Sequence, residues 1–401
     1  MKKSLCLLLC LCMLPLLSAC GSIYTNYKEI EQLLVIQTMG VDHTPNGVSL
    51  SLASGANPKS KNGVTRLFSD APSITTAVER IRKHSFEEEL FYGHISSVLL
   101  GEQAAKNGVD NYLMYICRAP DIRIDVPLYI LKNSEAKDAV LNVGNGSNGI
   151  TEIMSSIQQN LEWRGDGGLT RTADVVHDLR RHGSTLVCAL EYTQAAEFSG
   201  ELSGSEKSSP ADQAPPGLGQ SVSGGDNILR YQGYAIIRDG RLCDYIGRED
   251  AIGVSFLKNR VKVCDIIVPD RRGNTVTLEI DQGSSRIVPR WSTGGDLLGF
   301  DVNVEAEASI VEIDSGGLTS EESLNYILSQ LESSISDRVV NILQLSRRYR
   351  ADFLGLASNI EMDNPENFRN LQTDFDQLLP ELDIRVRVEG RLRHTNDLKD
   401  E

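Results

Sequence analysis

Ser255 and Lys258 are the residues of this 401-residue chain whose types and spacing come nearest to catalytic chemistry. They fit the S-x-x-K pattern, in which a serine acts as a nucleophile beside a lysine. The Lys-Thr-Gly and Ser-Asp-Asn motifs that accompany this pattern are absent, and the chain is rich in serine, so a chance match is expected. An extracytoplasmic cell-wall enzyme that uses this pair is therefore a rival hypothesis and not the favoured one.

Motifs typical of metal sites, nucleotide sites and serine hydrolases are missing from the sequence. The H-E-x-x-H pattern, the P-loop, G-x-G-x-x-G after a strand and G-x-S-x-G do not occur. The six histidines stand at positions 43, 84, 94, 177, 182 and 394. Without metal-ligand spacing, each is interpreted as a surface or hydrogen-bonded histidine. The sequence therefore predicts no catalytic residue, no metal and no cofactor, and a protein that is not an enzyme.

The segment LSAC, residues 17–20, closes an apolar run that follows two lysines. A basic start, a short apolar segment and a small-residue exit site are typical of a secretory signal peptide. Because the exit site coincides with a cysteine, this leader resembles a bacterial lipobox, in which the cysteine sulfur receives a diacylglycerol and cleavage falls just before it. We therefore expect a signal peptide at 1–19, lipidation of Cys20 and a tether at 20–31. An ordinary signal peptide with an incidental cysteine is the alternative.

The acidic balance of the chain argues against nucleic acid as a partner. Its formal net charge is −15 at pH 7, whereas proteins that bind nucleic acid neutralise phosphates with basic patches. An acidic surface also gains no attraction to anionic lipid heads. Membrane attachment is therefore expected to come from the lipid or from a protein partner.

Four cysteines follow Cys20, at positions 117, 188, 243 and 264. They are widely spaced and form no C-x-x-C motif. Cys117 and Cys188 lie in apolar segments, which is typical of buried free thiols. A disulfide is the alternative outside the cell, and the sequence does not give the pairing.

Strands and helices interleave over 32–195, which predicts a mixed N-terminal domain. Strands are expected at 33–42, 47–54, 91–101, 122–131 and 184–192, and TPNG predicts a hairpin turn between the first two. Helices are expected at 73–85, 134–142, 150–161, 171–182 and, with a break near Gly108, 102–118. Pro127 within its expected strand suggests an edge position or a bulge.

The region 196–228 is expected to be a linker, because Gly, Ser, Pro and charged residues leave too little apolar surface to form a core. Beyond it, alternating strands around Asp239-Gly240 predict a hairpin. A middle lobe is expected over 229–292 and a C-terminal lobe over 296–395. The C-terminal lobe is expected to hold an alternating strand at 297–313 and a long helix that opens with a capping box at 319–322.

Several segments together resemble the Ger(x)C family, the lipoprotein C subunits of nutrient germinant receptors in endospore-forming bacteria. Behind the lipobox, Lys28-Glu29-Ile30 and Gly40-Val41-Asp42 stand where that family has a basic-Glu-Ile element and a strand ending in Gly-Ile-Asp. Segments 91–123 and 232–261 resemble its Gly-His/Gly-Glu-x-x-Ala stretch and its Gly-x-Ala hairpin. The C-terminal signature is resembled by 343–360 and 364–392, where Gln344, Tyr349, Asp352, Gly355 and Pro380 fall in the expected places.

The resemblance implies an α+β fold of mixed sheets and helices in three lobes. It implies a non-catalytic, lipid-anchored subunit on the extracytoplasmic face of the inner spore membrane. Its partners would be the membrane-embedded A and B subunits of a receptor that senses small nutrients and triggers ion and dipicolinate release. A substrate-binding lipoprotein of an importer is the alternative, and it would need two similar lobes around a cleft.

The matched residues also have a purely structural interpretation. Gly40, Gly101, Gly240 and Gly355 are expected to be turn or close-packing glycines. Arg118, Arg123 and Asp352 are expected to be members of buried ion pairs, or else partner contacts. Cys20 is the one residue to which the sequence assigns a definite role.

Overall fold

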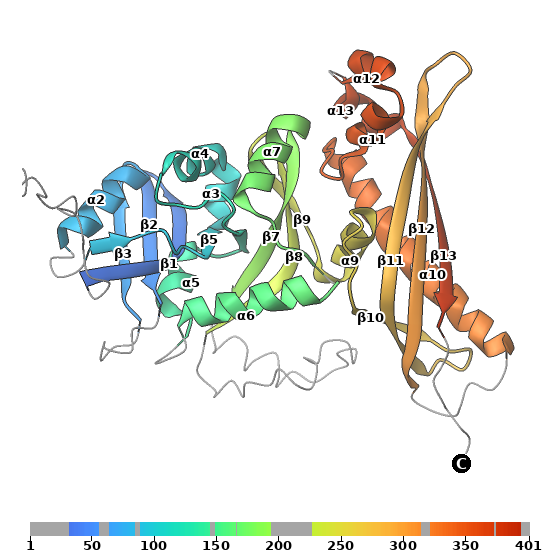
Figure 1. Cartoon of the computed structure of the whole chain (residues 1–401), viewed down its shortest axis with the longest axis horizontal. Coiled ribbons are helices and arrows are strands. Elements are labelled where there is room, and N and C mark those ends of the chain that lie inside the picture. The colour runs from blue at the N-terminus through green and yellow to red at the C-terminus, as the bar shows by residue number, and fades with distance from the viewer. Residues whose placement is uncertain are drawn as a thin grey trace, which may run out of the picture.

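The structure is a computed structural model that describes the residues 32–55, 64–84, 89–144, 149–165, 167–193, 227–313, 321–372 and 374–393. The predicted signal peptide, the tether and nearly all of the predicted linker lie outside these residues. The described residues form two β-sheets with their helices, and the two parts lie side by side along the long axis of the molecule (Figure 1).

The first sheet is mixed and, within the described residues, has nine strands. They are β1 (Leu33–Thr44), β2 (Gly47–Ser54), β3 (Arg66–Ala71), β4 (Glu89–Phe91), β5 (Ser97–Leu100), β6 (Leu128–Lys132), β7 (Ser184–Thr193), β8 (Ile228–Arg238) and β9 (Arg241–Ile246). Their order is β3-β2-β1-β5-β6-β7-β8-β9, with β4 beside the start of β1. The pairs from β1 through β5 and β6 to β7 are parallel, and those at either end of the sheet are antiparallel.

Helices cover both faces of the first sheet. One face carries α2 (Ile74–His84), α3 (Glu102–Asn107), α4 (Asp110–Arg118) and α7 (Thr172–His182), and the other carries α5 (Ala136–Asn142) and α6 (Ile150–Trp163). The strands supply both cores because alternate side chains point to opposite faces. Val98 and Leu100 face the α2 side, for example, whereas Leu99 faces the α5 side.

The second sheet has four strands among the described residues. They are β10 (Cys264–Pro269), β11 (Thr275–Trp291), β12 (Leu297–Ile313) and β13 (Asp383–Leu392) in that order, antiparallel except for the last pair. The parallel strand β13 requires a crossover, and the connection contains the long helix α10 (Glu321–Tyr349). Buried residues of α10 such as Leu331 and Ile335 belong to the same hydrophobic core as Val302 and Val304 of β12.

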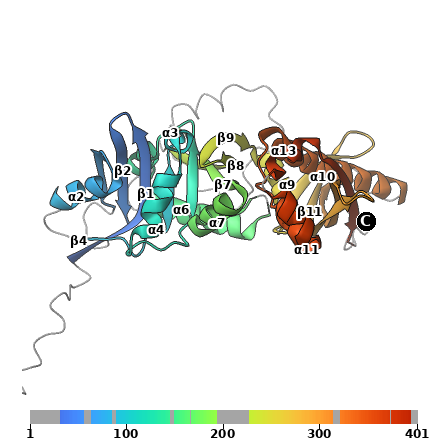
Figure 2. The same ribbon diagram turned by 90° about the horizontal axis from the view of Figure 1, so that it is seen from above.

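Smaller helices join the two sheets. The helix α9 (Arg248–Leu257) follows β9, and α11 (Leu356–Asp363), α12 (Pro365–Leu371) and α13 (Phe375–Leu378) follow α10. Leu186, Tyr234 and Ile236 of the first sheet belong to the same hydrophobic core as α9, α10 and the second sheet. The two parts therefore share buried apolar surface, and α9 lies between them in both views (Figure 2).

Most of the expected elements are confirmed. The β1–β2 hairpin, the helix expected at 73–85 and the break at Gly108 are present, as is the strand over 297–313 with Phe300, Val302 and Val304 buried. The β8–β9 hairpin turns at Asp239 and Gly240, with φ of 49° and 73°. Two positive φ angles at these positions are those of a type I′ turn.

Two expected strands are wrong in extent. In place of a strand over 91–101, the chain turns after Tyr92, whose carbonyl accepts a hydrogen bond from Ile95 N, and β5 begins at Ser97. The strand expected at 122–131 begins after Pro127, which has no N–H for the ladder. Pro127 precedes a central strand, between β5 and β7, instead of marking an edge.

The mixed α+β fold is as expected from the sequence. The expected lobe 229–292, however, is divided between the sheets, because β8 and β9 extend the first and β10 and β11 belong to the second. The division into three lobes stays a prediction. The capping box expected at 319–322 lies partly outside the described residues, and α10 begins at Glu321.

Candidate functional site

Cys20, the lipidation site predicted from the sequence, lies outside the described residues. The residues that carry the family resemblance can be placed. Among the described residues, no helix is both long enough and apolar enough to cross a bilayer.

Asp42, at the end of β1, is buried and caps the N-terminus of α5. Its Oδ1 accepts a hydrogen bond from the amide of Ala136 at 2.7 Å, and its Oδ2 accepts one from that of Lys137 at 2.8 Å. Burial raises the pKa of Asp42 to about 6, although the two hydrogen bonds lower it. A Cβ at Gly101 would lie 1.9 Å from Asp42 Oδ1. Asp42 and Gly101, both matched to the family, therefore have a structural role here.

The other matched glycines also meet the structural expectation. A Cβ at Gly40 would lie 2.4 Å from Ser51 Oγ, so this position is closely packed. Gly240 and Gly355 have φ of 73° and 75°, a conformation that favours glycine. These four glycines are therefore turn or close-packing residues, as predicted.

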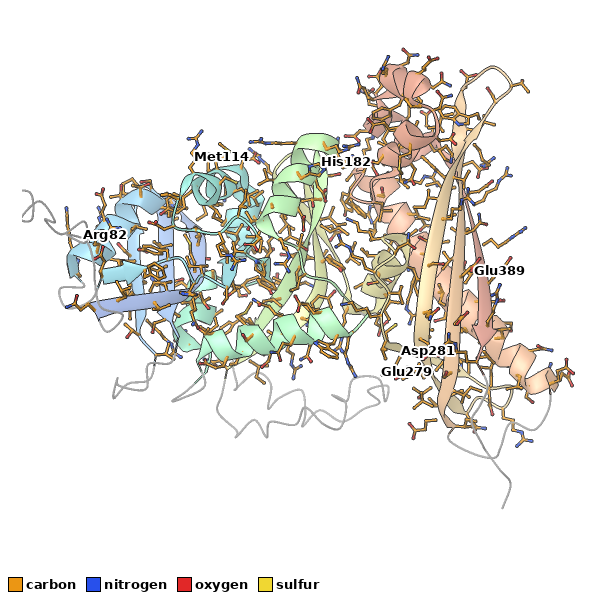
Figure 3. The ribbon with its side chains drawn as sticks, viewed as in Figure 1. Arg82, Met114, His182, Glu279, Asp281 and Glu389 are labelled. Atoms are coloured by element: carbon orange, nitrogen blue, oxygen red, sulfur yellow. The ribbon has the colours of Figure 1, made fainter. Side chains whose placement is uncertain are left out.

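Asp352 repeats the capping arrangement where the two sheets meet. Its carboxylate accepts hydrogen bonds from the amides of Leu356 and Ala357 at 2.7 and 2.8 Å, at the start of α11. His182 lies at the end of α7, on the side of the first part that faces the C-terminal helices (Figure 3). Its Nδ1 lies 3.7 Å from Asp352 Oδ2. Burial raises the pKa of Asp352 to about 7 and lowers the pKa of His182 and of Lys258. A buried acid and two partly buried bases thus lie together, and burial disfavours the charged form of each.

Polar contacts cross the junction around this cluster. Arg181 at the end of α7 forms an ion pair with Glu361 of α11. The hydroxyl of Tyr349 donates to Asp244 of β9, and Arg238 Nη1 donates to the Tyr349 carbonyl oxygen at 2.6 Å. The matched residue Tyr349 therefore joins α10 to the first sheet.

A cavity of about 510 Å³ opens at the same junction. Arg181 and His182 line it from α7, and Asp352, Phe375 and Asp376 line it from the C-terminal part.

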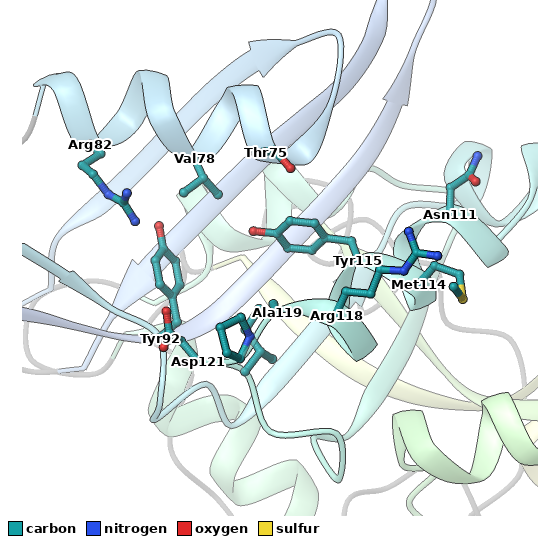
Figure 4. A pocket seen from close by; sticks show the side chains of 12 residues that line it. Thr75, Val78, Arg82, Tyr92, Asn111, Met114, Tyr115, Arg118, Ala119 and Asp121 are labelled. Atoms are coloured by element: carbon teal, nitrogen blue, oxygen red, sulfur yellow. The ribbon is translucent and has the colours of Figure 1, made fainter.

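A second cavity of about 510 Å³ lies between α2, α4 and the segments that follow β4 and α4 (Figure 4). Arg82 and Arg118 line it together with Tyr92, Tyr115 and Asp121. Tyr92 is 7% exposed, and its buried hydroxyl has no hydrogen-bond partner among the described residues. Both guanidinium groups are on exposed residues.

Arg118 and Arg123 are therefore not the buried ion-pair members that the sequence suggested. Arg123 is exposed and pairs with Asp125, with Nη2 and Oδ2 2.6 Å apart. Arg118 is exposed at the end of α4 and faces the second cavity. The hydrogen bonds of Arg123 to Asp125 hold the pKa of that carboxyl below its usual value.

Ser255 and Lys258 are not arranged as a nucleophile and its base. Ser255 is buried within α9, and its hydroxyl donates to the carbonyl oxygen of Ala251 at 3.5 Å, one helical turn back. Lys258 follows the end of α9 and lies in the Asp352 cluster. Within the described part of the chain, no group of three or more His, Cys, Asp or Glu residues is placed to hold a metal ion.

The described cysteines differ in their surroundings. Cys117, Cys188 and Cys243 carry free thiols, and Cys264 is buried in β10. Burial raises the pKa of Cys188 far above that of an exposed thiol. A buried, protonated thiol of this kind is unreactive.

The cavity between α2 and α4, lined by Arg82, Arg118, Tyr92 and Tyr115, was not predicted from the sequence. Its residues come from α2, from the connection after β4 and from α4, so that no single segment contains the pattern. A local signal existed, because the last turn of α2 carries Arg82, Lys83 and His84 in an otherwise acidic chain.

Comparisons with known proteins match both halves of the chain. Residues 26–191 match the model of the spore germination protein N-terminal domain, and residues 232–396 match the model described as spore germination B3/GerAC-like, C-terminal. A search of curated proteins found no match. A solved structure, the crystal structure of the GerBC protein, is similar with a TM-score of 0.55 and 16% identity, covering 89% of this chain and 97% of that chain. At this identity the likeness establishes the fold.

Proposed function

This chain belongs to the GerAC-like family of spore germination proteins, and on that premise we propose that it is the lipid-anchored, non-catalytic C subunit of a nutrient germinant receptor. The observation that carries the proposal is the match of the N-terminal and the C-terminal family models, in order, over most of the chain. A GerBC-like fold supports it, since that fold extends over nearly the whole of both proteins.

The lipid anchor is proposed at Cys20. Support comes from the sequence, where the small-residue exit site ends at this cysteine. Two or more acyl chains hold a protein stably at a membrane, whereas one chain is marginal. The anchor would place the protein on the extracytoplasmic face of the inner spore membrane and raise its effective concentration near the other subunits.

The proposed mechanism is binding, with the protein docked on the membrane-embedded A and B subunits. The burial of Ser255 and its hydrogen bond to Ala251 do not favour a serine enzyme. An importer's substrate-binding protein is also not favoured, because the two sheets differ in strand number and in topology. Two similar lobes around a cleft would be needed for that function.

Affinity purification from spore membranes tests the proposal. The chain with a C-terminal tag should carry the A and B subunits with it and should incorporate labelled fatty acid. Cys20→Ala should lose the fatty acid and at least most of the A and B subunits. Cys243→Ala, which removes an exposed thiol elsewhere, is the matched control and should behave like the wild type. A wild-type chain that reaches the membrane without either subunit would overturn the proposal.

A further inference from the structure

The cavity between α2 and α4 has the composition of a binding site. Its lining combines apolar residues, among them Val78, Met114 and Ile122, with the polar residues Arg82, Tyr92 and Arg118. A cavity of about 510 Å³ with a few convergent polar groups on an apolar lining is the usual form of a small-molecule site. Figure 4 shows the hydroxyl of Tyr92 pointing toward the guanidinium of Arg82, and that of Tyr115 pointing into the space between α2 and α4.

Three hydrogen-bond donors of this cavity, on Arg82, Arg118 and Tyr92, lack a partner among the described residues. Within the described part of the chain, neither the guanidinium group of Arg82 nor that of Arg118 forms a hydrogen bond or an ion pair. The buried hydroxyl of Tyr92 also lacks a partner there, and leaving such a group unsatisfied is unfavourable. Burial raises the pKa of Tyr92 well above its usual value, so that the phenol keeps its proton and remains a donor.

The charge of the cavity is opposite to that of the chain. Two guanidinium groups and one carboxylate, that of Asp121, line the cavity, whereas the formal net charge of the chain is −15. Guanidinium groups bind carboxylates and phosphates through charge-assisted hydrogen bonds. An oxyanion bound beside Arg82 would accept hydrogen bonds from its guanidinium and from the hydroxyl of Tyr92.

We propose that this cavity binds an anionic ligand, whose carboxylate or phosphate group lies against Arg82 and Tyr92. The apolar part of the ligand lies against Val78, Met114 and Ile122. The inference goes beyond the receptor role and does not depend on Cys20 or on the A and B subunits, so its failure would leave the proposed function untouched.

Calorimetric titration of the full-length chain in non-ionic detergent tests the inference. Benzoate carries a carboxylate on an apolar ring, and benzamide is its neutral match. Inorganic phosphate, dihexanoyl phosphatidylglycerol and zwitterionic dihexanoyl phosphatidylcholine are the other probes. We expect benzoate, phosphate or the anionic lipid to bind and both neutral or zwitterionic matches to bind at least tenfold more weakly. Binding of the anionic lipid without binding of free phosphate would identify a lipid headgroup as the source of the anion.

Variants locate the site. Arg82→Gln should weaken binding of the best anionic probe about tenfold or more, and Arg118→Gln, at the other end of the cavity, should weaken it less. Arg123→Gln removes the same charge from an exposed arginine outside the cavity lining and should bind like the wild type. Tyr92→Phe should weaken binding several-fold without loss of the ring, and Asp121→Asn should strengthen it.

Three results would overturn the inference. One is equal binding of benzoate and benzamide. Another is unchanged binding in Arg82→Gln. The third is an equal loss in Arg123→Gln, because this would indicate a response to overall charge. Because the arginines are exposed, their variants should fold, and thermal unfolding of each checks this.

Discussion

Asp42 and Asp352 use a buried carboxylate in the same way, each accepting two backbone hydrogen bonds at the start of a helix. The family resemblance identified both positions from the sequence, but their capping role depends on contacts that only the fold shows. The amide of Ala136, which donates to Asp42, lies 94 residues further along the chain. No local pattern contains such a pair, because only the parallel packing of β1 beside β5 and β6 brings the end of β1 to α5.

The first prediction concerns Gly101. Gly101→Ala would place a Cβ 1.9 Å from Asp42 Oδ1 and displace the carboxylate, so we expect the free energy of unfolding to fall by about 1–3 kcal/mol. Gly247→Ala is the matched control. Gly247 precedes α9 with φ of −66°, close to the −65° of Gly101, and a Cβ there would meet nothing within 4 Å. Chemical denaturation of both variants checks this, and equal stability would contradict it.

The second prediction concerns the pH dependence that Asp352 contributes. The unfolded carboxyl ionises near 3.8, whereas the folded one holds its proton up to about 7. The stability that this proton contributes is complete below about pH 4 and is lost as the pH rises toward 7. We expect Asp352→Asn to flatten this part of the stability profile, even where it loses a helix-capping hydrogen bond.

The measurement is the free energy of unfolding at several values between pH 4.5 and 7.5. Asp337→Asn, on the exposed side of α10, is the control and should leave the slope of the wild type unchanged. His182 and Lys258 are present in every protein compared. Parallel profiles for the wild type and Asp352→Asn would contradict the role assigned to Asp352.

At the scale of elements, the sequence predicts those parts that depend on local periodicity. The alternation over 297–313 specifies β12 and its buried residues, since a strand with one buried face needs a period of two. Alternation did not predict the segment 91–101 correctly, because a turn at 92–96 separates β4 and β5. The placement of β8 and β9 in the first sheet depends on pairing with β7, which sequence periodicity does not encode.

The third prediction tests the packing of α10. Ile335 is fully buried between α10 and the second sheet, so Ile335→Ala should lower the free energy of unfolding by about 2–5 kcal/mol. Asn341→Ala changes an exposed position on the same helix and should have little effect. Denaturant midpoints measure both. A loss below 1 kcal/mol at Ile335 would be at odds with a core that α10 shares with the second sheet.

At the scale of the whole molecule, the two sheets are joined by a common core and by polar contacts. Leu186 and Ile236 of the first sheet are buried with residues of α9, α10 and the second sheet, and Tyr349 adds its hydrogen bond to Asp244. The family resemblance, which rests on short segments, implied the role in a receptor. It could not give this arrangement, because the junction is built from residues that lie far apart in the chain.

The fourth prediction is that the two parts unfold together. The chain has two tryptophans, Trp163 at the end of α6 and Trp291 at the end of β11. Trp163→Phe and Trp291→Phe each leave one reporter, for the second and the first part respectively. Because the core is shared, their fluorescence transitions in denaturant should have the same midpoint. Midpoints that differ by more than the error of the measurement would mean that the parts are independent.

The receptor role itself is tested most directly by nutrient-triggered germination. Spores that lack this protein, and spores with Cys20→Ala, would be exposed to a panel of amino acids and sugars, with dipicolinate release as the readout and a non-nutrient trigger as control. We expect loss of the response to one class of nutrient in both strains, with the control intact. A normal response to every nutrient in the strain that lacks the protein would contradict the proposed function.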